Sequence, residues 1–244
     1  MKIGAMMCAF CESRMIVPSI KQFDGIDIED VFVAVSSKPW YGDNVRDDTA
    51  ERAVRAGAVV KLFDWKQEHE QKNWILDRMQ DFDWVLMFAP DMFMTKESLG
   101  KLTGFLRSDE ATNRGYGCNM LTYWRDLDHV IRPSPLFASV AIRPKERFVF
   151  SSIFKDFDRF SPVNEVIMHH LSWYRTDEEV STKIISYSHA PEIRGNEWYE
   201  KVWLAREENP VNFAPTVPED YKSLEEYPLP DELRDLLKKY NALI

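Results

Sequence analysis

The sequence predicts an α/β fold in which one domain holds a mainly parallel central sheet, a small antiparallel portion and C-terminal helices. Two observations lead to this prediction. Short apolar segments alternate with helical segments over the first half of the protein, which is typical of βαβ units with right-handed crossovers. Further on, apolar segments are separated by prolines and charged turns, which indicates shorter and partly antiparallel strands. With 244 residues, 45% of them hydrophobic, the protein can bury a sizeable core.

In the first half we expect buried strands, each a short apolar run rich in β-branched or aromatic residues. Their ranges are 3–8, 31–35, 58–63 and 84–87. Helices are expected at 13–23, 48–57, 71–82 and 98–107. Pro18 can lie only in the first turn of its helix, because proline has no backbone N–H to donate. Asp48 and Glu51 have capping-box spacing, which predicts that the carboxylate of Asp48 caps the second helix.

In the second half the expected strands are 117–124, 130–132, 138–142 and 147–153. Thr176 and Glu179 have the spacing of another capping box, which opens a helix that reaches about residue 187. A last short helix is expected at 231–240, after a stretch rich in proline and acids. We therefore divide the protein into one domain, 1–205, and a tail, 206–244, that wraps it.

The composition excludes some classes of protein. A net charge of −9 is the reverse of what a general nucleic-acid binder shows, so we expect no nucleic-acid partner. No apolar run approaches the roughly 20 residues that cross a bilayer, and we interpret the apolar start as a strand and not as a signal peptide. Three cysteines do not suggest a disulfide scaffold, which favours a reducing cytoplasm. Cys8 and Cys11 match C-x-x-C, a weak redox signal without flanking Trp and Pro.

Asp91 is the first candidate for chemistry. It follows the strand at 84–87 and Pro90, which ends strand pairing because proline cannot donate to a ladder. Ligands bind at the carboxyl ends of strands in open α/β sheets, and a carboxylate there can hold Mg²⁺ or Mn²⁺ with a diphosphate. The alternative is a simple cap of the following helix or turn.

Histidines and a lysine provide further candidates. His169 and His170 follow an apolar stretch, so one of them is expected to face inward, either as a metal ligand or as a hydrogen-bonded core residue. His189 is a metal or phosphate contact or a helix C-terminal histidine. Lys72 lies near a helix start, where it meets a phosphate or solvent. The sequence has no P-loop, no G-x-G-x-x-G and no G-x-S-x-G motif.

The order of these segments resembles the family-2-like glycosyltransferases of the GT-A fold, in a bacterial or viral type. The resemblance covers about residues 1–205. The matching positions are Glu12 after the first strand, Val35-Ser36-Ser37 after the second, Asp48-Thr49, Trp65 with Glu68, Gln71, Lys72 and Asn73, Asp83-Trp84-Val85-Leu86, and the tract from His169 to Glu179 with Lys183 and Ser188-His189-Ala190. The Asp-x-Asp signature of the family is degenerate, because it reads Ala89-Pro90-Asp91 and keeps only the second aspartate.

This resemblance implies a single Rossmann-like GT-A domain, with a nucleotide-binding half at 1–110 and an acceptor and metal half at 111–205. It implies a hexosyltransferase-like enzyme that moves a sugar from a nucleotide-sugar to a glycan or other hydroxyl acceptor, assisted by Mn²⁺ or Mg²⁺. The implied donor contacts are Glu12, Ser36, Asp48, Lys72 and Asn73, the implied metal ligands are Asp91, His169, His170 and His189, and the acceptor platforms are Trp124 and Trp173.

An inverting enzyme of this kind also needs a carboxylate base. Glu165, Asp126, Asp128 and Asp156 are all candidates, and we choose Glu165 because it precedes the histidine pair. Ala89 favours an alternative, a degenerate member of the fold that binds a sugar, a nucleotide or a partner without transfer. A nucleotidyltransferase ranks third, because the glycine-rich basic loop after the first strand is missing.

Overall fold

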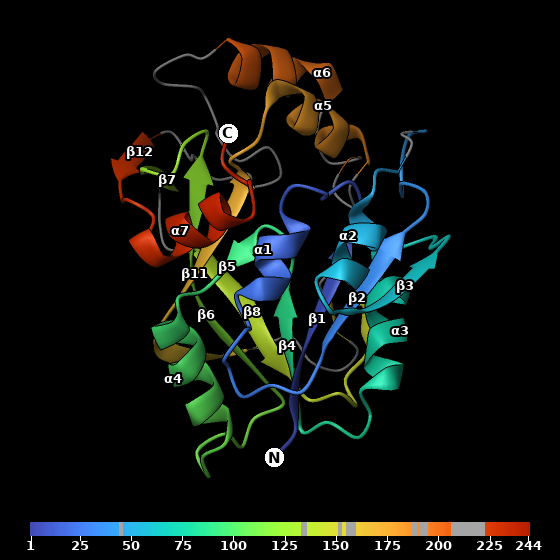
Figure 1. The fold of residues 1–244 in the computed structure, drawn as a ribbon, viewed down its shortest axis with the longest axis vertical. Helices are drawn as coiled ribbons and strands as arrows, with labels where there is room; N and C mark the ends of the chain where they lie inside the picture. Colours follow the sequence, from blue (N-terminus) through green and yellow to red (C-terminus); the bar gives the residue numbers. More distant parts are fainter. Residues whose placement is uncertain are drawn as a thin grey trace.

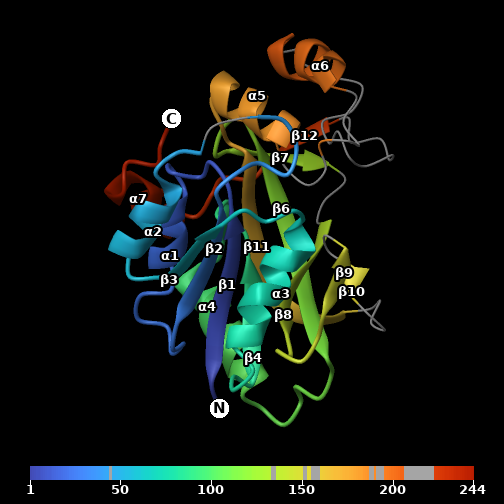
Figure 2. The same cartoon turned by 90° about the vertical axis from the view of Figure 1, so that its right-hand side faces the viewer.

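The computed structural model describes residues 1–43, 46–132, 136–150, 153–154, 160–186, 190, 195–205 and 223–244. A central sheet is covered by helices on both faces (Figure 1 and Figure 2). Among the described residues, no helix combines the length and the apolar character that crossing a bilayer requires.

The first half of the protein forms the parallel part of the sheet. Its strands are β1 (Ile3–Ala9), β2 (Val31–Ser36), β3 (Val59–Phe63) and β4 (Trp84–Phe88). β1 lies between β2 and β4 and pairs with both in parallel, and β3 extends the sheet beyond β2. Because β1 is covered on both faces, nearly all of its side chains are apolar and buried. The helices that connect and follow these strands are α1 (Ile16–Lys21), α2 (Thr49–Arg55), α3 (Glu68–Arg78) and α4 (Lys96–Leu106).

The second half of the protein extends the same sheet on the other side of β4. Here β8 (Leu136–Ile142) is antiparallel to both β4 and β6 (Gly115–Trp124), whereas β11 (Ser161–Trp173) is parallel to β6. Shorter strands complete this part: β5 (Met92–Phe93), β7 (His129–Arg132), β9 (Phe148–Phe150), β10 (Ile153–Phe154) and β12 (Ser223–Glu226). The mainly parallel sheet with an antiparallel portion that the sequence predicts is therefore confirmed.

Alternating residues of β1 serve the two faces of the sheet. Ile3, Ala5 and Met7 pack with α1, α2 and α4, whereas Met6 packs with α3. Gly4 lies on the α3 face, where an added Cβ would lie 2.6 Å from side-chain atoms of Met79. Glycine at this position therefore allows α3 to approach the strand closely.

C-terminal helices lie at two places on the sheet. α5 (Asp177–Ser186), α6 (Gly195–Trp198) and the π-helix η1 (Tyr199–Leu204) lie beyond the carboxyl edge of the parallel strands in both views (Figure 1 and Figure 2). α7 (Asp231–Lys239) inserts Leu233 and Leu237 into a cluster that includes Met15 and Phe93. The segment that follows β12 thus completes the core beside α1.

The expected caps have opposite outcomes. Thr176 and Glu179 form the predicted capping box, because the Thr176 Oγ1 accepts from the Glu179 N–H at 3.2 Å and the Glu179 carboxylate accepts from the Thr176 N–H at 2.9 Å. Asp48 is the N-cap residue of α2 as predicted, but its carboxylate makes no cap hydrogen bond and is paired with Arg52 at 2.8 Å. Asp47 instead accepts from the Thr49 N–H at 2.9 Å.

Two strand predictions also need correction. The expected strand 147–153 is divided into β9 and β10, which pair with each other. β11 is not among the expected strands, although it carries the histidine pair. Glu165 has a φ of 62°, and the pairing of β11 with β6 shifts register between Pro162 and Ile167. Such a bulge breaks the period-two alternation by which a strand is recognised in sequence.

Candidate functional site

Asp91 lies at the carboxyl edge of the sheet, as its position after β4 predicts. Its backbone carbonyl accepts from the Leu171 N–H at 2.7 Å, which ties the turn after β4 to β11. The Asp91 residue is 3% exposed. A carboxylate buried to this extent must be hydrogen-bonded or paired with a cation.

Two cations of the protein hold this carboxylate. The Oδ2 of Asp91 accepts from the Arg175 Nη2 at 2.9 Å and from the Lys183 Nζ at 2.8 Å. Arg175 Nη2 also contacts the Glu12 carboxylate, at 2.7 Å from Oε1. Lys183 Nζ also donates to the Ser172 Oγ at 2.8 Å. We call Glu12, Asp91, Arg175 and Lys183 the charged cluster; its members come from the β1–α1 loop, the turn after β4, the β11–α5 connection and α5.

Burial and charge act against each other within the charged cluster. Burial raises the pKa of Asp91, but the charges of Lys183, His170 and Arg175 outweigh burial and hold this pKa well below its usual range. The pKa of Glu12 is raised, because burial and the charge of Asp91 outweigh the effect of Arg175. The pKa of Lys183 is lowered by burial and by Arg175, with partial compensation from Asp91.

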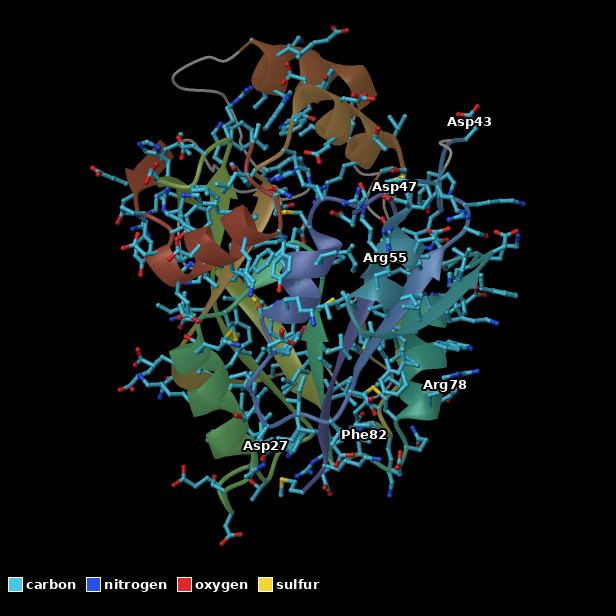
Figure 3. All side chains as sticks on the ribbon, viewed as in Figure 1. Asp27, Asp43, Asp47, Arg55, Arg78 and Phe82 are labelled. Atoms are coloured by element: carbon cyan, nitrogen blue, oxygen red, sulfur yellow. The ribbon has the colours of Figure 1, made fainter. Side chains whose placement is uncertain are left out.

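The position of Glu12 is fixed by hydrogen bonds from the segment that begins α2. Thr49 Oγ1 accepts from the Glu12 N–H at 2.8 Å, and Asp47 Oδ2 accepts from the Ser13 N–H at 3.0 Å. Figure 3 shows Asp47 beyond the start of α2, on the side of the molecule where α5 lies. Asp47 and Thr49 therefore position the loop that carries Glu12 into the charged cluster.

The two neighbouring histidines point to opposite environments, because successive side chains of a strand alternate. His170 Nε2 lies 3.5 Å from Asp91 Oδ1, and its Nδ1 lies 3.3 Å from the Thr122 hydroxyl. His169 Nδ1 hydrogen-bonds the Tyr123 hydroxyl at 3.0 Å inside the core, and burial lowers the pKa of His169 to about 4. His169 is thus a core histidine away from Asp91, and His189 lies outside the described residues.

A second group of polar atoms belongs to the segments that follow β2 and β3, at the same carboxyl edge of the sheet. Trp65 Nε1 and Gln71 Oε1 are buried without a hydrogen-bond partner, as are Trp40 Nε1 and His69 Nδ1. Trp65 is 7% exposed and Gln71 is fully buried. Buried polar atoms in native proteins are nearly always paired, so such atoms in one region indicate a missing partner.

The remaining predicted donor contacts have local roles in the structure. Ser36 is buried, and its hydroxyl donates to the Lys38 carbonyl. Asp48 belongs to the surface ion pair with Arg52. Asn73 makes two hydrogen bonds with the backbone of Phe148, at 2.8 and 2.9 Å, and so fixes β9. Lys72 pairs with Glu68 at 2.7 Å, and both charges act on the Cys8 thiol at the end of β1.

The predicted base residues are not brought to the charged cluster. Glu165 lies on β11 five residues before His170, which is roughly 16 Å along a strand, and it pairs with Lys101 of α4 at 3.4 Å. Asp126 pairs with His129, and Asp128 with Arg234. Asp156 lies outside the described residues. Glu165 is close to the histidine pair in sequence but not in space, because β11 is an extended strand and not a turn.

The aromatic and thiol candidates are part of the core. Trp124 and Trp173 are buried in a cluster with Trp203, with ring centroids 5.2 and 6.4 Å from it. Neither ring is therefore an open sugar platform. Burial raises the pKa of the Cys8 thiol, and burial together with Asp47 raises the pKa of Cys11 to about 11, which opposes the thiolate that redox exchange requires.

A divalent metal ion does not fit the residues at Asp91. Its Oδ2 is taken by Lys183 and Arg175, which leaves Oδ1 and His170 as the nearest pair of donors. Within the described part of the protein, no three His, Cys, Asp or Glu side chains form a group that could hold a metal. An ion at Oδ1 would also lie near two cations, and unit charges about 4 Å apart repel by about 4 kcal/mol near a protein surface.

Arg175 and Lys183 are the two members of the charged cluster that the sequence does not point to as candidates. Both occur in the tract that resembles the glycosyltransferases, without an assigned role. Lys183 lies three residues after Val180 and next to Ile184, which are both buried, so its position on the inner side of α5 could be inferred from helical periodicity. No signal in the sequence indicates that Arg175 turns toward Glu12 and Asp91.

No family model and no curated protein matches the sequence. GT-A glycosyltransferases are among the solved structures that are similar to this protein, at low identity. Glucosyl-3-phosphoglycerate synthase from Mycobacterium tuberculosis in complex with phosphoglyceric acid has a TM-score of 0.49 and 16% identity, over 94% of this chain and 87% of that chain. The complex of that synthase with Mn²⁺, uridine diphosphate and phosphoglyceric acid has a TM-score of 0.47 and 15% identity, over the same shares. S. aureus TarS 1–349 has a TM-score of 0.45 and 12% identity, over 70% of this chain and 61% of that chain.

Proposed function

We propose that this protein transfers a sugar from a nucleotide-sugar donor to a hydroxyl group of a glycan or another acceptor. The carboxyl edge of the sheet carries the proposal. Lys183 and Arg175 contact Asp91, which follows β4, and the unpartnered atoms of Trp65 and Gln71 belong to the segment that follows β3. A diphosphate needs cations, and a nucleobase needs hydrogen-bond donors and acceptors in a buried place. This edge offers both.

The nucleobase part of the proposal depends on the buried atoms that lack hydrogen-bond partners. Trp65 Nε1 and Trp40 Nε1 are donors, whereas Gln71 Oε1 is an acceptor, because the Gln71 amide nitrogen already donates to the Ala34 carbonyl. A pyrimidine or purine edge carries donors and acceptors that complement this set. Ligand binding would therefore satisfy atoms that the free protein leaves unsatisfied at a cost.

The chemical step follows from the charge that the leaving group acquires. As the glycosidic bond to the diphosphate breaks, negative charge grows on the departing phosphate oxygen, and a fixed ammonium group stabilises it without reorganisation. Lys183 is fixed in this way by Asp91 and Ser172. The protein would in addition hold the acceptor hydroxyl close to the sugar carbon, which lowers the entropic part of the barrier.

The second candidate is a protein of this fold that binds a nucleotide or a sugar without transfer. The described positions of Glu165, Asp126 and Asp128 favour it, since each carboxylate is paired elsewhere and away from Asp91. The enzyme proposal includes transfer of a hexosyl group. It also includes a cytoplasmic location, which agrees with cysteines that form no disulfide in the described residues.

The test combines binding with turnover. The wild-type protein is titrated with UDP, GDP, ADP and CDP by calorimetry, and the matching nucleotide-sugars are incubated with it while free nucleoside diphosphate is measured. We expect saturable binding of one nucleotide and slow release of that nucleotide from its sugar. Binding without release, across a set of sugar acceptors, would select the second candidate, and absence of both would reject the two.

A further inference from the structure

We propose that the ammonium group of Lys183, supported by Arg175, binds the donor diphosphate in the place that a divalent metal ion would otherwise occupy at Asp91. Nucleoside diphosphates are then bound without metal. This inference rests on the proposed function and states how the same site holds the anionic part of its substrate.

Asp91 binds two cationic side chains of the protein itself. Its Oδ2 accepts from both Lys183 Nζ and Arg175 Nη2, at 2.8 and 2.9 Å. The Lys183 side chain is 14% exposed, whereas the Arg175 side chain is 3% exposed. Lys183 is therefore the cation of this pair that a ligand can reach, and Arg175 acts from behind it through the shared carboxylate.

Two further groups adapt the site to an anion. Ser172 Oγ of β11 accepts from Lys183 at 2.8 Å and helps to fix the position of the ammonium group. His170, with a side chain that is 18% exposed, has its Nε2 3.5 Å from Asp91 Oδ1, so that a cationic or polar group of the protein lies beside each oxygen of this carboxylate. A phosphate at this point would meet the ammonium group of Lys183 and no bare carboxylate oxygen of Asp91.

Charge balance favours an anion over a metal ion. The carboxylates of Asp91 and Glu12 offset Arg175 and Lys183 in the free protein. A bound diphosphate adds negative charge beside the ammonium group of Lys183 and the guanidinium group of Arg175, which attract it. A divalent ion would instead add positive charge beside two cations.

The test compares nucleotide binding with and without metal. Wild-type protein is titrated with UDP, GDP, ADP and CDP in buffers that contain either excess EDTA or MnCl₂. We expect the nucleotide that binds to have the same affinity within about twofold in both buffers. A loss of tenfold or more in EDTA overturns this inference and leaves the proposed function intact, whereas the absence of binding in both buffers overturns both.

The variant that carries the inference is Lys183→Met, which keeps the alkyl stem and removes the charge. We expect it to bind the nucleotide at least tenfold more weakly in both buffers, while Lys183→Arg retains part of the affinity. Lys201→Met is the matched control, because Lys201 is an exposed lysine of the neighbouring helix η1. Wild-type affinity in Lys183→Met would overturn the inference, and thermal unfolding shows that each variant is folded.

A second readout uses Mn²⁺ alone. Electron paramagnetic resonance measures free Mn²⁺ in the presence of the wild-type protein and of Asp91→Asn. We expect the two proteins to leave the same amount of Mn²⁺ free, because Asp91 is engaged by Lys183 and Arg175. Mn²⁺ binding that disappears in Asp91→Asn would overturn the inference without any reference to turnover.

Discussion

At the scale of single residues, some buried polar side chains are hydrogen-bonded or ion-paired within the protein, whereas others have a polar atom without a partner. Asp91 is buried and fully paired, and His169 is buried and hydrogen-bonded to Tyr123. Trp65 Nε1, in contrast, is a buried donor without an acceptor. The first two residues have their partners within the free protein, whereas the third costs free energy that a ligand could recover.

Trp65→Phe tests this distinction, because it removes the Nε1–H and keeps an aromatic ring. We expect the melting temperature to stay the same or rise, since an unsatisfied donor is lost. We expect the affinity for the nucleotide to fall about fivefold, which corresponds to about 1 kcal/mol for one hydrogen bond. Calorimetry and thermal unfolding measure the two effects. A variant that loses stability and keeps its affinity would show that Trp65 only packs the core.

His169 predicts how stability depends on pH. Burial lowers its pKa to about 4 from an ordinary value of 6.5, so the unfolded protein binds the proton more readily than the folded protein between these values. The free energy of unfolding should therefore rise with pH from about 4 to 6.5 and become level above, with a contribution of up to about 3 kcal/mol.

Urea unfolding at a series of pH values measures this slope. In His169→Gln, which keeps a hydrogen-bonding side chain, we expect the slope between pH 4 and 6.5 to diminish. His129→Gln is the control, because His129 lies on the surface beside Asp126. A slope that His169→Gln leaves unchanged would assign the pH dependence to other groups.

At the scale of elements, the position of α5 decides where the charged cluster forms. The capping box of Thr176 and Glu179 begins this helix, and Lys183 lies within it. Arg14 donates to the Glu179 carboxylate at 2.8 Å and so ties the start of α5 to the loop before α1. The same loop carries Glu12. The capping box of α5 is therefore coupled to the charged cluster in two ways, through α5 itself, which carries Lys183, and through the loop before α1, which carries Arg14 and Glu12.

Thr176→Ala should weaken both the helix and the cluster. Loss of an N-cap hydroxyl costs about 1 kcal/mol, and we expect this decrease in the free energy of unfolding by urea. We also expect weaker nucleotide binding, because a frayed start of α5 loosens Lys183. Thr176→Ser, which restores the hydroxyl, should recover both quantities. Recovery of stability without recovery of affinity would contradict the coupling.

At the scale of the whole molecule, the C-terminal segment completes the core of the first half. Leu237 is fully buried in the cluster that contains Met15 and Phe93, which come from the beginning and the middle of the sequence. Arg234 donates to the Leu127 carbonyl at 2.7 Å and adds a polar contact to the same interface. Residues 223–244 are thus an integral part of the fold, whereas nothing in their sequence specifies the surface that they cover.

Leu237→Ala should lower the free energy of unfolding by about 2–4 kcal/mol, because it leaves a cavity among packed side chains. Leu236→Ala is the matched control on the same helix, since Leu236 is only partly buried. We expect it to cost about 1 kcal/mol or less, because less apolar surface returns to water. Urea unfolding of both variants measures the difference. Equal losses would show that α7 does not insert its buried face as described.

The sequence by itself determines the parallel half of the sheet, the place of Asp91 at its edge and the start of α5. These features depend on local signals: buried β-branched runs, a proline that ends a strand, and a threonine three residues before a glutamate. Such signals act over a few residues, so they can be recognised without knowledge of the fold.

Only the tertiary structure decides which charges meet. Glu12 and Asp91 are far in sequence from each other and from Arg175 and Lys183, and all four come together because β1, β4, β11 and α5 converge at one edge of the sheet. The same packing turns His169 into the core and carries Glu165 away along β11. Pairing across long separations depends on strand register and on the bulge at Glu165, which no local pattern encodes.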